Sequence, residues 1–518
     1  MSTSADTPVA DSAEDARKKD AAHAARSGAV QILTIAAQAL ITVTHVLLAR
    51  LFGRAVFGGY QACLAILEVL TRGGTGGADK GMLRYIAGFR ARGQPDLARS
   101  ALGTGLRLCL GVASAAALLL LVLAGPLASL SHDPALANGL RVLAPVTILT
   151  GTMWVLVQAS LAAKTTRANF IVRGVGEPTL LLAAGLLAAL AGRSLAHLAL
   201  AHVIAAAVTL GLAVIVVGRV FGPGELRRAL AAPRLPGFAH FSIPLGLADL
   251  TNAILQRADI VLLTIFVGPR ATAVYAAAEF VTRVTANARY AFDSVAAPMF
   301  SEAIHLGDRQ RLQDNLLMIT RWVTLAAAPI AVTVVSLRRE LLALYGPGFQ
   351  EGTTALSLLA MGHLVNAIMG LSGWILTVSG RSRTILVNNI IAATANVLMG
   401  LTLIPRFGLV GTAIAALGSV TLVNLLVVVE VWRWQRVHQL SLSIAKPLVA
   451  AGATLAVEFA IGHLLDNVAL RIVATVLVGL ASYLAALFAL GLSPDDRRLL
   501  GKLRARIAAW FGRANSPG

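Results

Sequence analysis

Two stretches of this chain decide its fold: VLLARLFGRAVFGGY (46–60) and VLLTIFVGPRATAVY (261–275). Shifting the chain on itself by 215 positions pairs their opening Val-Leu-Leu, pairs Gly53 with Gly268, and pairs the tyrosines that end both stretches. Leucine matches are common in so apolar a chain. A glycine and a tyrosine at the same step of the same helix, turn, helix pattern are more informative. We therefore predict an internal repeat that relates the two halves.

About fourteen apolar stretches of some twenty residues fill the chain, and each can cross roughly 30 Å of hydrocarbon at 1.5 Å per residue. Within lipid, a helix satisfies its own backbone polar groups. An even number of spans in each half gives both halves the same orientation. We predict an all-α polytopic membrane protein with two parallel six-helix repeats and two further carboxy-terminal helices. The predicted spans lie near 28–49, 55–75, 101–124, 140–163, 169–191, 196–220, 240–267, 271–297, 320–337, 353–378, 383–404, 408–432, 446–465 and 469–490.

The composition between the spans divides the chain into parts. The segment GPGELRRALAAPRLPG (222–237) combines helix breakers with arginines, which is typical of a linker. The amino-terminal residues are polar and mixed in charge, unlike a secretory signal peptide. The predicted parts are a disordered cytoplasmic tail (1–27), an N-lobe of six spans (28–221), the cytoplasmic linker (222–237), a C-lobe of six spans (238–436), two more spans (437–492) and a basic cytoplasmic tail (493–518).

The chain is strongly basic, with a net charge of +19 from 44 Lys and Arg against 25 Asp and Glu. In a soluble protein this excess would favour nucleic acid as a partner. With the amino terminus in the cytoplasm, however, about 30 of the basic residues fall in inner segments and about nine in outer loops, which follows the positive-inside rule. We therefore expect both termini in the cytoplasm, a secondary attraction to anionic lipids, and no nucleic acid partner.

Ionisable groups inside the spans indicate a candidate substrate path, because each is costly in lipid and should face protein or water. The seventh span carries polar residues spaced three, four and three apart, which places them on one stripe of a helix: Asp249, Asn252, Gln256 and Asp259. In the eighth span, Glu279 and Arg283 form an i, i+4 pair. We interpret these stripes as lining a hydrated cleft between the lobes. The alternative is that they only join helices to one another.

The first span, which the repeat equates with the seventh, has a polar stripe of its own: Gln31, Thr34, Gln38, Thr42 and His45. The repeat also equates Glu68 with Arg283, so we hypothesise that the two are coupled across the lobes. Local pairing of Glu68 with Arg72, and of Glu279 with Arg283, is the competing interpretation.

Several sites can be set aside from the sequence. In the glycine-rich segment 73–81, Asp79 stands where a phosphate-binding loop has glycine, and Gly81 replaces the required Ser or Thr. It is typical of a flexible helix end. No residues have metal-ligand spacing, and Cys63 and Cys109 lie inside apolar spans, so we expect no metal site, cofactor or disulfide. Arg173 and Glu177 are interpreted as a local ion pair near the inner surface.

The chain resembles the polysaccharide repeat-unit (O-antigen and exopolysaccharide) flippases of the MOP (multidrug/oligosaccharidyl-lipid/polysaccharide) exporter superfamily. The resemblance covers most of residues 28–435, and its motifs are loose patterns that specify family better than substrate. They are QRAD at 256–259, LLTIFVG at 262–268, YAAA at 275–278, Pro298 with Glu302, the segment 345–360, GRS at 380–382 and IPRFGLVG at 404–411.

This resemblance implies a non-enzymatic exporter in the bacterial inner membrane. Such a protein would move an undecaprenyl-pyrophosphate-linked oligosaccharide to the outer leaflet by alternating access, for lipopolysaccharide or exopolysaccharide synthesis. A pyrophosphate head needs a partly cationic path. The candidates for charge contacts are Arg283, Arg257, Arg289 and Arg107, with the first the strongest. The implied partners are the lipid-linked substrate, membrane lipids, and a polysaccharide polymerase or export proteins.

Three alternatives remain. Lipid II flippases of the same superfamily also have two extra spans and cationic residues on the path. A multidrug or cation antiporter would favour an acidic path and commonly has twelve spans. A membrane enzyme that polymerises lipid-linked sugars would need sizeable outer loops, but the longest one here, Arg338 to Thr353, has only about fifteen residues.

Overall fold

The computed structural model describes residues 8–222, 224–439 and 441–491, with side chains from Ala39 onward apart from residues 255, 291 and 294. Every regular element in this part of the chain is helical, which confirms the all-α fold class. The elements are α1 (Pro8–Gly74), α2 (Ala78–Ala91), α3 (Pro95–Leu130), α4 (Pro134–Ala162), η1 (Asn169–Gly176), α5 (Glu177–Ala191), α6 (Leu195–Phe221), α7 (Glu225–Ala231), α8 (Phe238–Phe266), α9 (Pro269–His305), α10 (Arg309–Ser336), α11 (Arg338–Ala343), η2 (Phe349–Gly352), α12 (Thr353–Met369), α13 (Ser372–Val378), α14 (Ser382–Gln435), α15 (Leu442–Leu464) and α16 (Val468–Ala489).

Ten helices of the described residues are long and apolar enough to cross a membrane, so the chain is a multi-pass membrane protein. Two of the ten are broken helices that each cover two predicted spans, one beginning at Ala39 and the other at Ser382. The predicted spans 240–267 and 271–297 correspond to α8 and α9, which carry more polar and charged side chains. The predicted spans thus lie mainly in helix, with the one at 353–378 divided into α12 and α13, while the total of fourteen stays a prediction.

Glycines with positive φ mark the sharp reversals between consecutive spans. Gly53 breaks α1 into two helices, Gly268 separates α8 from α9, and Gly408 breaks α14. Only glycine enters these backbone regions without strain. The first two of these positions are the pair that the proposed repeat equates, and the tyrosines that the repeat also pairs, Tyr60 and Tyr275, are both buried.

The disordered cytoplasmic tail over residues 1–27 stays a prediction, and residues 1–7 lie outside the described residues. Helix α1 already begins at Pro8 and continues through this segment. The segment is rich in alanine and also contains lysines and arginines, which are strong helix formers. The predicted tail at 493–518 lies outside the described residues.

Contacts divide the chain into two compact units. The first contains residues 1–51, 67–124 and 138–250, and the second contains 52–66, 125–137 and 251–518. Helix α8 contributes its beginning to the first unit and its remainder to the second. The division therefore does not follow the 222–237 linker, where the predicted lobe boundary stays a prediction.

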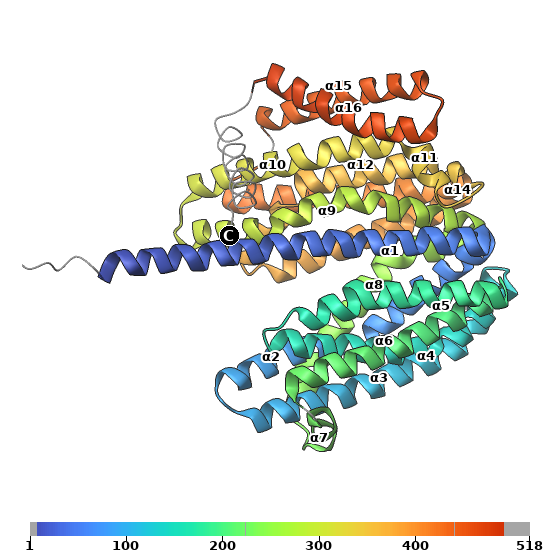
Figure 1. Ribbon diagram of the computed structural model, residues 1–518, viewed down its shortest axis with the longest axis vertical. Coiled ribbons are helices and arrows are strands. Elements are labelled where there is room, and N and C mark those ends of the chain that lie inside the picture. Colours follow the sequence, from blue (N-terminus) through green and yellow to red (C-terminus); the bar gives the residue numbers. More distant parts are fainter. Residues whose placement is uncertain (1–7, 223, 440, 492–518) are drawn as a thin grey trace, which may run out of the picture. The chain divides into compact units, whose positions relative to one another are not determined.

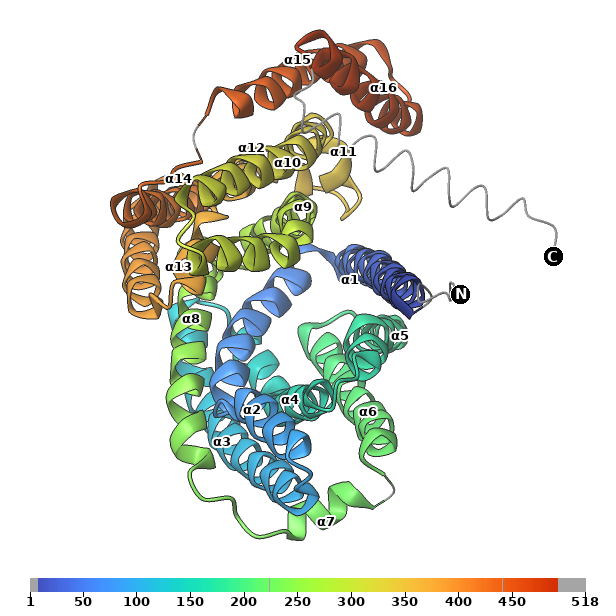
Figure 2. The ribbon, with the colours of Figure 1, turned by 90° about the vertical axis from the view of Figure 1, so that its left-hand side faces the viewer.

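The first unit has a core of apolar side chains from α2, α3, α4, α6 and the start of α8, including Met82 and Phe238, which are fully buried. The linker between α6 and α8 contains the short helix α7 (Figure 2). The Arg99 side chain of α3 forms an ion pair with Glu225 of α7 at 2.8 Å. This contact fastens the linker helix to a long apolar helix.

The second unit has a core between α9, α10, α12, α13 and α14, with Phe300 and Leu371 fully buried. The last two helices, α15 and α16, lie side by side (Figure 1). They pack on α10, where the Tyr483 hydroxyl donates a hydrogen bond to the Leu325 carbonyl at 3.2 Å. The buried Glu458 carboxylate of α15 accepts hydrogen bonds from two hydroxyls of α10.

The glycine-rich segment 73–81 forms the turn between α1 and α2 and not a phosphate-binding loop. Gly77 has a φ of 68°, and a Cβ placed there would lie 2.0 Å from the Ser242 carbonyl oxygen of α8. Gly246 of α8 packs against the same turn, and a Cβ placed at Gly246 would lie 2.6 Å from the backbone of Gly76 and Gly77. The glycines therefore allow the backbones of α8 and this turn to pack in direct contact.

Candidate functional site

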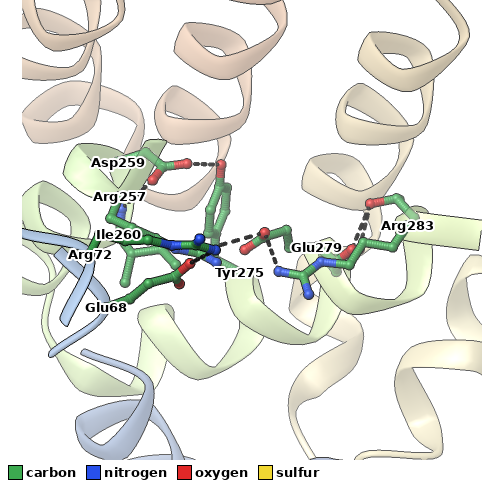
Figure 3. Close-up of polar contacts among 10 residues, drawn as sticks. Glu68, Arg72, Arg257, Asp259, Ile260, Tyr275, Glu279 and Arg283 are labelled. Carbon is green, nitrogen blue, oxygen red and sulfur yellow. Dashed lines mark hydrogen bonds and ion pairs between the residues drawn. The ribbon is translucent and has the colours of Figure 1, made fainter. Parts of the chain in front are cut away.

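Three charged side chains of α8 and α9 meet in one cluster, which we call the Arg257–Glu279–Arg283 cluster (Figure 3). The Glu279 carboxylate accepts a hydrogen bond from Arg283 at 2.8 Å and one from Arg257 at 3.3 Å. The side chains of Glu279, Arg283 and Arg257 are 25%, 31% and 19% exposed, respectively. One carboxylate oxygen therefore accepts hydrogen bonds from two guanidinium groups.

A second polar contact lies beside this cluster on the same two helices. The Tyr275 hydroxyl donates a 2.7 Å hydrogen bond to the Asp259 carboxylate (Figure 3). The other oxygen of Asp259 accepts from the Ile260 backbone N–H at 2.8 Å. Tyr275 is 1% exposed, so the contact is inside the protein. Sequence reasoning used Tyr275 as a mark of the repeat and did not identify it as a partner of Asp259.

The α8–α9 hairpin explains how these residues come together. The chain reverses at Gly268, and the Thr264 and Thr272 hydroxyls are 2.9 Å apart next to the reversal. Residues at equal distances on either side of the turn then face one another. The i, i+4 spacing of Glu279 and Arg283 adds the third charge to the same helical face.

The remaining residues of the predicted α8 stripe have different surroundings. Asp249 forms an ion pair with Lys80 of α2, within the first unit. Asn252 is half-buried and Gln256 is exposed. Lys80 lies in the glycine-rich segment 73–81. Asp249 is 169 positions away from it in the chain, which is too far for a spacing rule to predict the pair.

The other N-lobe candidates also have local contacts. Glu68 lies 3.8 Å from Arg72, which is the expected i, i+4 pair (Figure 3). The buried His45 has its Nδ1 atom 2.8 Å from the Ile41 carbonyl oxygen. The side chain of Gln38 lies outside the described residues, as do those of Gln31 and Thr34.

The last two arginine candidates make contacts that join elements. Arg107 of α3 donates a 2.5 Å hydrogen bond to the Leu230 carbonyl of α7. Arg289 lies 3.6 Å from Asp293 on α9, whose carboxylate also accepts from the Trp374 indole N–H at 2.9 Å. These contacts favour a structural role for Arg107 and Arg289 over the charge contacts that the resemblance implied.

Arg173 and Glu177, which the sequence predicts as a local ion pair, act on one another electrostatically but make no ion-pair contact within 4 Å among the described side chains. The Arg173 guanidinium instead lies over the indole ring of Trp154, 5.4 Å from its centroid. Among the described residues, no group of three or more His, Cys, Asp or Glu side chains is arranged to hold a metal ion. Cys63 and Cys109 are free and buried.

Comparison with known sequences identifies relatives of this chain. A profile of the family described as polysaccharide biosynthesis protein matches residues 47–352. The probable flippase AglR of Haloferax volcanii is 27% identical over 210 residues, which cover 39% of this chain and 43% of that protein. The chain thus spans less than half the length of this curated relative.

Solved structures extend the likeness to the whole fold. A lipid II flippase, MurJ, in an inward closed conformation, matches with a TM-score of 0.67 at 13% identity, covering 88% of this chain and 97% of that one. An inward-facing MATE-family multidrug resistance transporter of the MOP superfamily matches with a TM-score of 0.60 at 14% identity, covering 80% and 95%. At such identities the likeness concerns the fold alone.

Proposed function

This chain belongs to the polysaccharide biosynthesis protein family, and on that premise we propose that it is a flippase for an undecaprenyl-pyrophosphate-linked oligosaccharide repeat unit. It moves the repeat unit from the inner to the outer leaflet of the bacterial inner membrane and makes no covalent change to it. Both termini lie in the cytoplasm. A polysaccharide polymerase or export protein would take the repeat unit on the outer side.

The observation that carries this proposal is the Arg257–Glu279–Arg283 cluster on α8 and α9, the helices of two predicted spans. Charged groups at such depth are costly and mark substrate or ion paths. A guanidinium group carries five N–H donors, and an arginine binds phosphate through two parallel hydrogen bonds. The sugars need a polar path as well, whereas the polyprenyl tail can stay in lipid.

The test is polysaccharide export with variants of Arg283. Arg283→Ala is expected to block export, while Arg283→Lys retains part of it, because a point charge only partly replaces a bidentate fork. Arg270→Ala is the matched control, since Arg270 is exposed at the beginning of the same helix. Surface polysaccharide and immunoblotted membrane protein are measured together. Normal export by a fully expressed Arg283→Ala variant would remove Arg283 from the site.

The same assay separates the other members of the superfamily. A lipid II flippase would instead restore growth to cells depleted of their own lipid II flippase. A cation antiporter would change resistance to cationic drugs and leave surface polysaccharide unaffected. Either result, with unchanged polysaccharide, would contradict the proposed substrate.

A further inference from the structure

We propose that Arg72, Trp154 and Arg173 form a second ligand site, which binds the phosphate group of a phosphate-bearing lipid. The three residues come from α1, α4 and η1, all within the first unit. The Arg72 guanidinium carbon lies 4.3 Å from the centroid of the Trp154 ring, and that of Arg173 lies 5.4 Å from it. Two positive charges are therefore held on one indole, and their separation cannot exceed the sum of these distances.

Donors without acceptors accompany these charges. The Trp154 Nε1 and Arg173 Nε atoms are buried and reach no hydrogen-bond partner among the described residues. An unsatisfied buried donor is costly, and native proteins leave few of them. An anion between the two guanidinium groups would satisfy such donors with charge-assisted hydrogen bonds. The two cation–π contacts hold the arginines in place without consuming their N–H groups.

The carboxylates nearby leave this pair of cations incompletely neutralised. Glu68 approaches Arg72 only to 3.8 Å. Glu177 acts on Arg173 through charge but makes no close contact with it, and lines a cavity of about 30 Å³ with His202 and Thr209. Arg72 is also 43% exposed, so a ligand can reach it. The site therefore suits an anion and not a second cation.

The backbone around Arg173 departs from the geometry of an α-helix. Arg173 lies in the π-helical segment η1, between Asn169 and Gly176. Such segments shift side chains relative to an α-helix and are frequent at functional sites. A Cβ at Gly176 would lie 2.8 Å from the Ile171 carbonyl oxygen, so glycine permits the wide turn. The π-helical turn thus accounts for the position of the Arg173 guanidinium over the Trp154 ring.

The proposed ligand follows from this chemistry. Planar guanidinium groups recognise phosphate with a geometry that chloride cannot match. Within a membrane the phosphate group belongs to a lipid. Two kinds of lipid carry such a group: a polyprenyl-linked oligosaccharide, in its diphosphate, and an anionic phospholipid, in its headgroup. The first source rests on the proposed function, and the second does not.

The test is direct binding of inorganic pyrophosphate to the full chain in phosphatidylcholine nanodiscs, measured by calorimetry. Every protein carries Arg283→Ala, so that the Arg257–Glu279–Arg283 cluster contributes less to the signal. We expect saturable binding that falls about tenfold or more with Arg173→Gln, the loss typical of one charge-assisted hydrogen bond. Trp154→Phe keeps a ring under both arginines but removes the Nε1 donor, so its binding falls less.

A matched control exists in the second unit, where Arg381 lies 3.7 Å from the centroid of Trp434. Arg381→Gln removes a similar cation–π contact and should leave pyrophosphate binding unchanged. Arg173→Lys, which keeps the charge, should bind at an intermediate level if Arg173→Gln is poorly folded. Equal binding by the folded Arg173→Gln, Trp154→Phe and parent proteins would overturn the site, and so would a parent protein that binds no pyrophosphate.

Competition identifies the source of the phosphate. Displacement of pyrophosphate by geranylgeranyl diphosphate, but not by phosphatidylglycerol added to the nanodiscs, supports the lipid-linked substrate. Equal displacement by phosphatidylglycerol supports a headgroup. Because binding is measured without export, a protein that binds but does not export repeat units would contradict the proposed function and leave this site standing.

Discussion

Gly53 and Gly268 lie 215 positions apart and share one backbone conformation, with φ and ψ of 76° and 169° at the first and 101° and 176° at the second. Each stands between two consecutive helices. This region of backbone space is essentially restricted to glycine. The two halves of the chain therefore have a glycine of the same backbone conformation at equivalent positions between two helices, which supports the internal repeat.

Gly268→Ala tests this requirement. No atom lies within 4 Å of a Cβ built at Gly268, so any cost comes from the backbone and not from a clash. We expect the variant to lose about 1–3 kcal/mol of stability, the strain of a non-glycine residue in this region. Gly111→Ala is the control, because its Cβ also meets open space while its backbone is helical. Thermal unfolding in detergent measures both, and equal midpoints would count against the strain argument.

Tyr275→Phe removes the hydroxyl that donates to Asp259. We expect a loss of about 1–3 kcal/mol, because a buried carboxylate then lacks one donor. Tyr345→Phe is a matched control, since Tyr345 is equally buried and its hydroxyl has no partner among the described residues. Thermal unfolding should separate the two variants. A loss as large in Tyr345→Phe would mean that the Asp259 contact contributes nothing specific.

The attachment of α7 should depend on pH. Hydrogen bonds from Arg99 and Arg228 lower the pKa of Glu225 in the folded protein. The resulting stability is present above the ordinary carboxyl pKa of about 4.3 and is lost as the pH falls through the lower folded value. The unfolding midpoints of the parent and Glu225→Gln should therefore differ by a constant amount between pH 6 and 8 and converge in acid. A gap that widens in acid would contradict the assignment.

The orientation of the chain is a separate prediction. The distribution of Lys and Arg places the amino terminus, the 222–237 linker and residue 518 in the cytoplasm, with Arg406 outside. Reporter fusions after residues 230, 406 and 518 should be active as cytoplasmic, periplasmic and cytoplasmic reporters, respectively. A periplasmic carboxy terminus would refute the even number of spans.

The local signals of the sequence were sufficient for the fold. Apolar stretches located the helices, the glycine pair located the hairpin turns, and i, i+4 spacing found the contact of Glu279 with Arg283. For Arg173 and Glu177 the same rule found two charges that act on one another without a close contact, at a π-helical turn whose register differs from an α-helix.

Contacts between distant segments could not be read from the sequence. Lys80 and Asp249 are 169 positions apart, and Arg107 and the Leu230 carbonyl are 123 apart. A side chain that donates to a backbone carbonyl leaves no pattern of residue types. Arg107 stays a candidate for charge contacts, and its hydrogen bond to the Leu230 carbonyl of α7 could not be predicted from the sequence.

Transport in a purified system tests the central claim most directly. The protein is reconstituted into vesicles that carry a fluorescent undecaprenyl-pyrophosphate-linked oligosaccharide, and a membrane-impermeant quencher reports the leaflet in which the sugar resides. We expect the parent protein to move the sugar between leaflets, Arg270→Ala to match it, and Arg283→Ala to be at least about tenfold slower, as expected from the loss of one charge-assisted contact. Movement no faster than in vesicles without protein would contradict the account.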